Sequence, residues 1–304
     1  MKFLIRGTPV HGHTGPVTMP LASGPGPRFS IVIPAHNEEA FLGACLDSLL
    51  AQDYRDPCQI IVVDNNSTDG TARVAAERGV TVVHESQPGV CWARQCGTRL
   101  ADGEIVVSTD ADTVFSPGWL SRIDQEFRRD PARVAVAGPC RFTNAPWWGR
   151  AYAWVLFHLV QLGTRLTGRV PYVTATNLAF RKSAFCGYDT QATQGGDELG
   201  LLRKLRAHGP VAFIPGNPVF TSARRMYRGL VYNLLVTCMF YYLLGYSLNR
   251  LTGRTIVGMA PSIRTADPAS PVRRRMQGLV SAGVGLVLLA AAGDLTIHLA
   301  RRWG

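Results

Sequence analysis

The chain has 304 residues, enough for one α/β domain of about 200 residues and a substantial further segment. Its seven cysteines are scattered, odd in number and without a CxxC pair, which argues against a disulfide framework or zinc ribbon and favours a reducing cytoplasm. The net charge of +11 accompanies a mean hydropathy just above zero, a pairing that favours an anionic membrane surface as partner.

Nucleic acid is the other partner that such a charge suits. The arginines form no single basic stripe interleaved with aromatic residues, and no C₂H₂, RNP or basic-zipper pattern occurs. We therefore expect no nucleic acid as a partner.

The N-terminal 28 residues are rich in Gly, Pro, Thr and His, and we expect a disordered leader there. Their short apolar run before Arg6 is not typical of a signal peptide. From Phe29 a regular pattern of buried-strand runs and helical periodicity begins. It predicts strands at 29–34, 59–64, 80–84, 104–110 and 134–139, and helices at 38–52, 71–79, 88–101 and 117–130, the last with Pro117 in its first turn.

Strands that alternate with helices of this length predict right-handed βαβ units, a mostly parallel sheet and helices on both of its faces. Ligands of such sheets bind beyond the carboxyl ends of the strands. Three polar clusters follow strands here: Ala35–Glu39, Asp64–Asp69 and Asp110–Asp112. We expect these clusters to converge.

The second half of the chain is less regular. It predicts an apolar, aromatic helix or pair of helices at 147–166, a strand leading into a helix at 172–185, a helix at 197–209 and a strand at 211–215. Two long apolar segments follow, Gly229–Leu248 and Gly278–Ala300, separated by a linker that contains Pro and Arg. We predict a leader at 1–28, a catalytic domain at 29–225 and membrane-associating helices at 226–304.

The stretch STDAD ends the fourth strand with two carboxylates one residue apart, Asp110 and Asp112. A hard cation such as Mg²⁺ or Mn²⁺ prefers oxygen ligands, and it can take the remainder from a diphosphate and water. A turn with two solvated aspartates is the alternative interpretation. The position at a strand end favours the metal site.

Four stretches carry a family resemblance by their order and spacing: IVIPAHNEEAFLGACLDSLLAQDY, IIVVDNNSTDGT, ADGEIVVSTDAD and TNLAFRK. Together they resemble the inverting glycosyltransferase family 2, over roughly residues 29–225. The resemblance implies a GT-A type, Rossmann-like α/β fold. It also implies transfer of a sugar from a nucleoside-diphosphate sugar to an acceptor hydroxyl.

The same resemblance implies a nucleoside pocket made by the first two polar clusters, from Pro34, Ala35, Asn37, Glu38, Asp64 and Asn65. Asn65 departs from the family, which often has a second aspartate there, so the base preference stays open. For Ser67, Thr68 and Asp69 we favour helix capping over ligand binding.

Around the third cluster, the resemblance implies that Asp110 contacts the ribose or base, with Ala111 beside it in the substrate site, and that Asp112 ligates the divalent metal. Arg94 occupies a position where family members often carry a basic residue near the nucleotide. A surface arginine is an equally good interpretation.

On the acceptor side, Asp197 matches the family's general base, and Gly196 stands where the family often has glutamate. Glu198 is the second candidate, because a shift of the match by one residue would place it there. An acidic first turn that complements the helix dipole is the alternative interpretation of Asp197. Thr176 and Asn177 match the wall next to the diphosphate, with a turn role as the alternative. Arg224 and Arg225 suit a diphosphate, an acidic lipid headgroup or a membrane-surface anchor.

Both C-terminal apolar segments have the length of a bilayer span, although Asp294 and His298 interrupt the second. If both crossed, the arginine-rich linker would lie opposite the catalytic domain, against the positive-inside tendency. We therefore expect at most one of the two segments to span the bilayer. We expect the catalytic domain at the cytoplasmic face of a membrane. The acceptor that we expect is lipid-linked or a polysaccharide. Packing of both segments in a soluble domain is the alternative.

Other functions fit less well. A sugar-phosphate nucleotidyltransferase would carry a GxGxR-type loop where this chain has PAHNEE, and a dehydrogenase would carry GxGxxG. A non-catalytic, membrane-associated nucleotide-sugar-binding protein stays open because of Gly196 and Asn65.

Overall fold

The computed structural model describes residues 26–190, 196–233, 235, 240 and 244. These form two compact units. The first comprises 26–143, 150–190 and 196–222, and the second comprises 144–149 and the described residues from 223 onward. The leader up to residue 25 and most of the predicted C-terminal helices lie outside the described residues.

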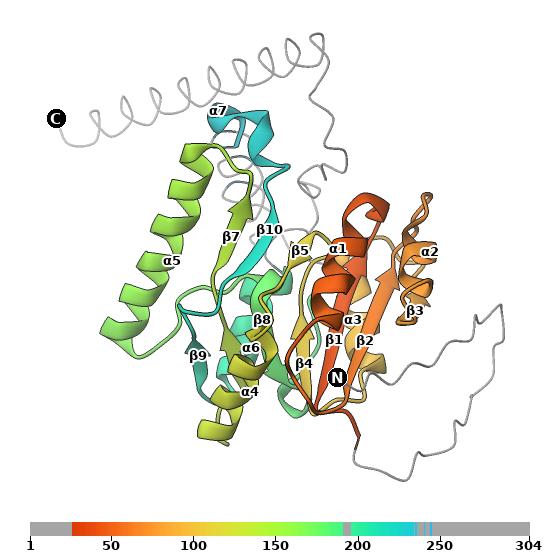
Figure 1. Cartoon of the computed structure of the whole chain (residues 1–304). Coiled ribbons are helices and arrows are strands. Elements are labelled where there is room, and N and C mark those ends of the chain that lie inside the picture. Colours follow the sequence, from red (N-terminus) through yellow and green to blue (C-terminus); the bar gives the residue numbers. More distant parts are fainter. Residues whose placement is uncertain (1–25, 191–195, 234, 236–239, 241–243, 245–304) are drawn as a thin grey trace. The chain divides into compact units, whose positions relative to one another are not determined.

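A seven-stranded sheet in the order β3-β2-β1-β4-β8-β6-β9 organises the first unit (Figure 1). Neighbouring strands pair in parallel except where β8 lies between β4 and β6. This confirms the predicted mostly parallel sheet. The strands are β1 (Phe29–Ala35), β2 (Cys58–Asp64), β3 (Thr81–His84), β4 (Ile105–Ser108), β6 (Ala135–Ala137), β8 (Leu178–Arg181) and β9 (Val211–Phe213).

The central strands are continuous runs of β-branched and other apolar residues, as expected for a sheet that is covered on both faces. The α-helices of this fold are α1 (Glu39–Leu50), α2 (Thr71–Ala76), α3 (Val90–Leu100), α4 (Trp119–Arg129), α5 (Trp147–Thr167) and α6 (Leu201–Arg206). α3 packs closely on the sheet: a Cβ atom on Gly97 would lie 2.5 Å from Val32 and 2.9 Å from Val63.

A second sheet of three short strands was not predicted. It has the order β5-β10-β7, with β5 (Thr113–Val114), β10 (Val219–Ser222) and β7 (Cys140–Thr143). Strands of two to four residues are too short to show a periodic pattern. The sheet matters because β5 begins directly after Asp112 and pairs with β10.

Two smaller expectations need correction. α4 begins at Trp119, so Pro117 precedes the helix. The helix predicted after β8 is only a 3₁₀ turn, Lys182–Ala184. For 147–166, where a helix or a pair of helices was predicted, the structure has a single helix, α5.

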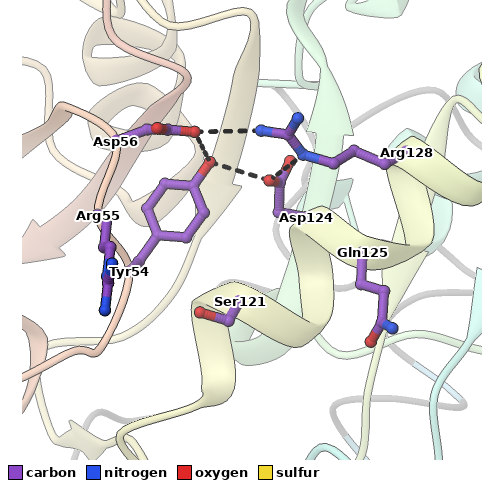
Figure 2. A pocket seen from close by; sticks show the side chains of 7 residues that line it. All are labelled: Tyr54, Arg55, Asp56, Ser121, Asp124, Gln125 and Arg128. Carbon is purple, nitrogen blue, oxygen red and sulfur yellow. Dashed lines mark hydrogen bonds and ion pairs between the residues drawn. The ribbon is translucent and has the colours of Figure 1, made fainter.

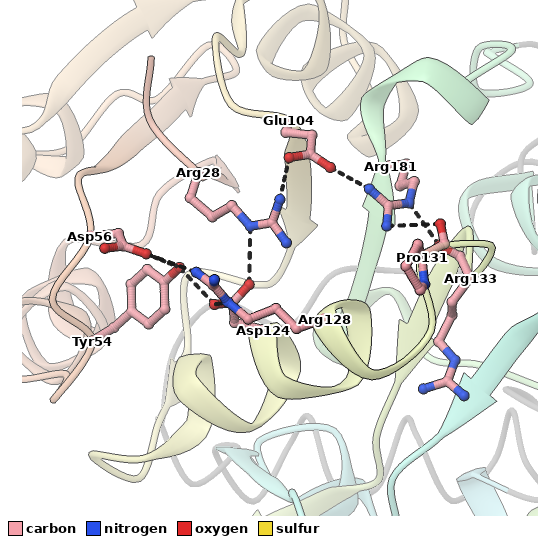
Figure 3. Close-up of polar contacts among 9 residues, drawn as sticks. All are labelled: Arg28, Tyr54, Asp56, Glu104, Asp124, Arg128, Pro131, Arg133 and Arg181. Atoms are coloured by element: carbon pink, nitrogen blue, oxygen red, sulfur yellow. Dashed lines mark hydrogen bonds and ion pairs between the residues drawn. The ribbon is translucent and has the colours of Figure 1, made fainter. Parts of the chain in front are cut away.

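A polar network fastens α4 to the amino ends of the strands (Figure 3). The Nε atom of Arg28, which precedes β1, donates to Asp124 at 3.0 Å, and Arg128 Nε donates to the same carboxylate at 2.6 Å. The hydroxyl of Tyr54 donates to Asp124 at 3.0 Å. Glu104, which precedes β4, forms ion pairs with both Arg28 and Arg181.

The second unit is described only in part. It contains a 3₁₀ turn, Met226–Arg228, and the short helix α7 (Leu230–Tyr232). Of the predicted apolar segments, Gly229–Leu248 is described in part and Gly278–Ala300 lies outside the described residues. Among the helices that the structure describes, none has the length and apolar character needed to cross a bilayer.

Candidate functional site

The carboxyl ends of β1, β2 and β4 meet at one edge of the large sheet. Ala35 of β1 is in register with Asp64 of β2, and Val32 of β1 is in register with Ser108 of β4. The pairing continues one residue further, where Thr109 N donates to Val32 O at 3.2 Å. The register therefore brings together the three polar clusters seen in the sequence.

The loops that follow β1 and β2 are joined by hydrogen bonds. Pro34 and Ala35 end β1, and Asn37 then adopts a left-handed backbone with φ of 54°. Asn37 N donates to Ser67 Oγ at 3.0 Å, and Asn37 Oδ1 accepts from Thr68 N at 2.7 Å. The two loops form one connected rim.

Two helix starts complete this rim. Glu38 N, just before α1, donates to Thr71 Oγ1 at 2.8 Å. Asp69 accepts from Thr71 N at 3.0 Å and from Glu39 N at 3.2 Å, so it caps α2 and α1 together. Burial alone would raise the pKa of Asp69, but the hydrogen bonds from Thr71 and Glu39 hold it below the ordinary value. Capping is confirmed for Asp69, whereas Ser67 and Thr68 bond the neighbouring loop.

Asp64 and Asn65 lie side by side but differ in surroundings. Asp64 accepts from Ser67 N at 3.2 Å, and its other oxygen lies 3.8 Å from His84 Nδ1. Asn65 donates to Glu85 O at 2.8 Å and Gln87 O at 2.6 Å, and it accepts from Gly89 N at 2.8 Å. An aspartate has no N–H donor for the two carbonyls. Asn65 therefore ties the loop after β2 to residues 85–89, and an aspartate could not make the two bonds that Asn65 donates.

Arg94 lies beneath the site and is not a surface residue. Its side chain is 2% exposed. It donates to the Ser108 hydroxyl, to Thr109 O at 3.1 Å and to Asp110 Oδ1 at 2.5 Å. The buried guanidinium of Arg94 therefore orients the carboxylate of Asp110, the first aspartate of STDAD.

The second oxygen of Asp110 is held from the opposite side. Thr176 Oγ1, in the 3₁₀ turn Ala175–Asn177, donates to Asp110 Oδ2 at 2.6 Å. Thr109 Oγ1 in turn donates to Thr176 O at 2.8 Å. The Asp110 side chain remains 36% exposed, so it is oriented and accessible at once.

Asp112 follows at the start of the small sheet, after the buried Ala111. Thr221 Oγ1 of β10 donates to Asp112 Oδ1 at 3.1 Å, and Ser222 N donates to Asp112 O at 3.2 Å. Thr221 was missed in the sequence because only the unpredicted sheet places it there.

Asn177 is buried in the fold, and its expected place in the wall next to the diphosphate stays a prediction. It is 2% exposed. Its carboxamide accepts from Trp119 Nε1 at 3.0 Å and donates to Pro139 O at 3.0 Å and Asn217 O at 2.9 Å. Contact with a ligand would require breaking these buried bonds, whereas Thr176 faces Asp110.

The two candidate bases stand in a π-helical turn, Gly196–Gly200, that precedes α6. The side chain of Asp197 lies outside the described part of the structure. Glu198 accepts from Tyr172 OH at 3.3 Å and from Ala175 N at 3.4 Å. Glu198 therefore contacts the same turn that supplies Thr176, and Tyr172 is a neighbour that the sequence did not reveal.

Two buried thiols report how the carboxylates are grouped. Burial, together with the charges of Glu198, Asp110 and Asp112, raises the pKa of Cys140 to about 12. Burial also raises the pKa of Cys45, with added contributions from Asp112, Asp110 and Glu38. The charges of Asp110 and Asp112 act on both thiols, and hydrogen bonds link Asp110 and Glu198 to the same 3₁₀ turn.

The donor atoms at this edge suit a cation that is shared with a ligand. Within the described residues, no three His, Cys, Asp or Glu side chains form a ready metal cage. Asp112 and Asp110 supply carboxylate oxygens, the ligand type that Mg²⁺ and Mn²⁺ prefer, and such ions often keep waters and substrate phosphates as further ligands. The residues present fit that kind of cation.

Arg224 and Arg225 belong to the second unit, whereas Asp110, Asp112 and Glu198 belong to the first. Arg225 is exposed and Arg224 is half-buried. Their expected contacts with a diphosphate or a headgroup stay predictions.

A cavity of about 330 Å³ lies elsewhere, at the amino ends of the strands (Figure 2). Tyr54, Asp56, Asp124 and Arg128 line it: Arg128 Nη2 donates to Asp56 at 3.1 Å, and Asp56 and Asp124 share the single proton of the Tyr54 hydroxyl at 3.1 Å and 3.0 Å. Arg128 pairs with both carboxylates, and Arg28 pairs with Asp124 as well, so ion pairs satisfy these charges. We assign this cavity a structural role.

Comparison with known proteins places this geometry in context. The model of Glycosyl transferase family 2 matches residues 30–187, just over half of the chain. An uncharacterized glycosyltransferase of Mycobacterium bovis is 38% identical over 187 residues, which cover 60% of this chain and 81% of that relative. A glucosyl-dolichyl phosphate glucuronosyltransferase of Haloferax volcanii is 24% identical over 189 residues, covering 56% of this chain and 59% of that relative.

Among solved structures, a mannosyltransferase from Pyrobaculum calidifontis in complex with GDP-Man and Mn²⁺ superposes with a TM-score of 0.59. It is 21% identical, and the match covers 92% of this chain and 85% of that one. Identity at this level establishes the fold alone. The predicted GT-A type fold is confirmed.

Proposed function

This chain belongs to glycosyl transferase family 2, and from that premise we propose that it moves a sugar from a nucleoside-diphosphate sugar to an acceptor hydroxyl with inversion at the anomeric carbon. The observation that carries the proposal is the cluster of carboxylates around the 3₁₀ turn Ala175–Asn177: Thr176 Oγ1 donates to Asp110 Oδ2 at 2.6 Å, and Ala175 N donates to Glu198 Oε1 at 3.4 Å. This cluster adjoins the joined loops that follow β1 and β2.

The nucleoside would bind along that rim, against Pro34, Ala35, Asn37, Glu38 and Asp64. The hydrogen bonds between the two loops support this role, because a rim that is ordered before binding loses less entropy when the ligand arrives. Asp110 would accept a hydrogen bond from a ribose hydroxyl, with its carboxylate oriented by Arg94 and Thr176.

Asp112 would hold a divalent cation, Mn²⁺ or Mg²⁺, together with the diphosphate. When bound, such a cation offsets the charge that develops on the departing nucleoside diphosphate. One observation and one physical argument support this role. Thr221 orients the Asp112 carboxylate. Without a cation between them, the negative charges of Asp110 and Asp112 would repel a diphosphate. The mannosyltransferase neighbour, solved with GDP-Man and Mn²⁺, is consistent with it.

For the transfer step we assign Asp197 as general base and Glu198 as the alternative. The acceptor oxygen attacks the anomeric carbon, its proton passes to the carboxylate, and the bond to the diphosphate breaks with its electron pair on the leaving oxygen. Glu198 already accepts two hydrogen bonds, which stabilise its charged form and make it the weaker base.

The acceptor that we propose is lipid-linked, at the cytoplasmic face of a membrane. The apolar C-terminal segments and the net charge of +11 support this proposal. So does the relative from Haloferax volcanii, whose name describes a dolichyl phosphate substrate.

The direct test incubates the full chain with Mn²⁺, a panel of UDP-, GDP- and TDP-sugars and a lipid extract, and measures the nucleoside diphosphate that is released. We expect release from one donor class and its loss in Asp112→Ala, with the exposed Asp102→Ala as the matched control that keeps activity. Donor binding without release under every condition would overturn the transferase proposal in favour of a non-catalytic binding protein.

The base assignment has a separate test. Asp197→Asn should lower kcat by roughly 10²- to 10⁴-fold with little effect on nucleotide affinity. Glu198→Gln should retain most of kcat, because the one carbonyl oxygen of glutamine can still accept from Ala175 N while its NH₂ group donates to the hydroxyl oxygen of Tyr172. The reverse pattern would make Glu198 the base.

A further inference from the structure

One side of α5 exposes a row of large apolar side chains. Tyr152, Val155, Leu159, Leu162 and Leu166 are 49%, 46%, 59%, 52% and 77% exposed, and we call them the α5 stripe. Their spacing of three and four residues puts them along one side of the helix. Scattered surface leucines need no explanation, but a continuous row of this kind marks an interaction surface.

The stripe is not the core-facing side of the helix. Ala153, Phe157 and Val160 are buried, and the Phe157 ring stacks on Phe213 of β9 with centroids 6.3 Å apart. α5, the long green helix in Figure 1, therefore keeps one side in the fold and presents the other to a partner.

The flank of the stripe has the composition of a lipid headgroup contact. Trp154 is 62% exposed and its ring lies 3.9 Å from that of His158. Arg165 is exposed on the same flank, Arg169 follows the helix end, and α5 contains neither Asp nor Glu. Tryptophan and arginine beside an apolar stripe are typical of helices that lie in the plane of an anionic membrane surface.

The positive charge beside the α5 stripe indicates which partner covers it. A second copy would bring another α5, with no acidic residue to pair with Arg165. The chain's own residues 245–304 are themselves rich in arginine. An anionic bilayer supplies both the apolar layer and the opposite charge.

We propose that α5 lies flat on an anionic bilayer, with the α5 stripe in the boundary between headgroups and acyl chains and with Trp154 and Arg165 at the headgroups. This inference rests on the membrane partner of the proposed function and deepens it by naming the contact surface.

The test uses the full chain, with Cys96, Cys186 and Cys238 replaced by serine and one new cysteine that carries the environment-sensitive fluorophore NBD. Leu159→Cys places the label in the α5 stripe. Leu100→Cys, at an exposed leucine of α3, is the matched control. Emission is recorded with vesicles of phosphatidylcholine alone or with phosphatidylglycerol, with and without quenching doxyl lipids, and co-sedimentation is measured in parallel.

We expect a shift to shorter wavelength and doxyl quenching at position 159 with phosphatidylglycerol vesicles, and no change at position 100. Protein that sediments with vesicles while the label at 159 stays unchanged would overturn the role of α5 and leave the membrane partner intact. Absence of sedimentation would overturn both the role of α5 and the membrane partner.

A label that is already blue-shifted without vesicles would show that a second copy or the chain's own residues cover the α5 stripe. Equal shifts on phosphatidylcholine alone would overturn the role of anionic charge. None of these outcomes depends on sugar transfer, so the transferase proposal is judged separately.

Discussion

At the scale of single residues, the STDAD aspartates differ in how they are held. Asp110 has one oxygen on Arg94 and the other on Thr176, so its orientation is set before any ligand arrives. Asp112 is oriented by Thr221 from the small sheet. The difference supports a division in which Asp110 positions the nucleoside and Asp112 holds the cation.

Arg94→Met tests the first part of that division. Methionine fills the buried space but leaves Asp110 with Thr176 alone, and we expect a loss of about 2 kcal/mol in unfolding free energy. Nucleotide affinity should also fall. Urea unfolding and calorimetric titration measure the two effects. Arg94→Lys keeps the charge but cannot donate to Ser108, Thr109 and Asp110 together. Its stability and nucleotide affinity should lie between those of the unmodified chain and those of Arg94→Met. Unchanged stability and affinity in Arg94→Met would refute the clamp.

At the scale of elements, α3 is fixed on the sheet by Gly97. A methyl group there would collide with branched side chains in the core, so Gly97→Ala should cost about 1–3 kcal/mol through overpacking. Gly43→Ala in α1 is the matched control. Its nearest neighbour is the flexible end of Arg78, and alanine favours the helix. Equal midpoints for the two variants in urea unfolding would contradict the packing argument.

The network that ties α4 to the strands predicts a pH dependence. Burial acts to raise the pKa of Asp124, but hydrogen bonds from Arg128, Arg28 and Tyr54 outweigh it and hold the pKa below the ordinary value of 3.8. A folded-state pKa below the unfolded one means that the unfolded chain binds more protons as the pH falls. The stabilisation is therefore present above about pH 4 and is lost as the pH falls through the folded pKa.

Asp124→Asn should thus lower the unfolding free energy at pH 7 by about 2–3 kcal/mol and flatten its dependence on pH below pH 5. Asp47→Asn is the control: Asp47 pairs with Arg78 but is 62% exposed. Its effect should stay within about 1 kcal/mol. Urea unfolding from pH 7 to pH 3 measures both. A parallel pH profile for Asp124→Asn and the unmodified chain would contradict the role assigned to Asp124.

At the scale of the whole molecule, the sequence predicts what depends on long, local patterns. The buried runs of β1 and β2 are unambiguous, and parallel pairing then requires their carboxyl ends to meet. The partners of individual side chains depend on contacts between distant segments. Arg94 is buried with partners on Ser108, Thr109 and Asp110. Asn177 bonds Trp119, Pro139 and Asn217 in the core. Asn65 binds carbonyl groups some twenty residues away.

Contacts between distant segments also determine the short strands and the orientation of α5, so the sequence could not predict them. β5, β7 and β10 are held by one another and carry little signal of their own, so the neighbourhood of Asp112 could not be predicted. The helical pattern of 147–166 is clear, but an apolar helix can face a core or a partner. Only the packing of Phe157 on β9 shows which side is which.

The measurement closest to the central claim is a calorimetric titration of the full chain with UDP, GDP and TDP, each with and without Mn²⁺, repeated for the tightest case with Asp112→Ala. The account predicts that one nucleotide binds, that binding requires Mn²⁺, and that Asp112→Ala abolishes the requirement together with most of the affinity. Binding that is equally tight without Mn²⁺ and in Asp112→Ala, or no binding of any nucleotide to a folded chain, would contradict it.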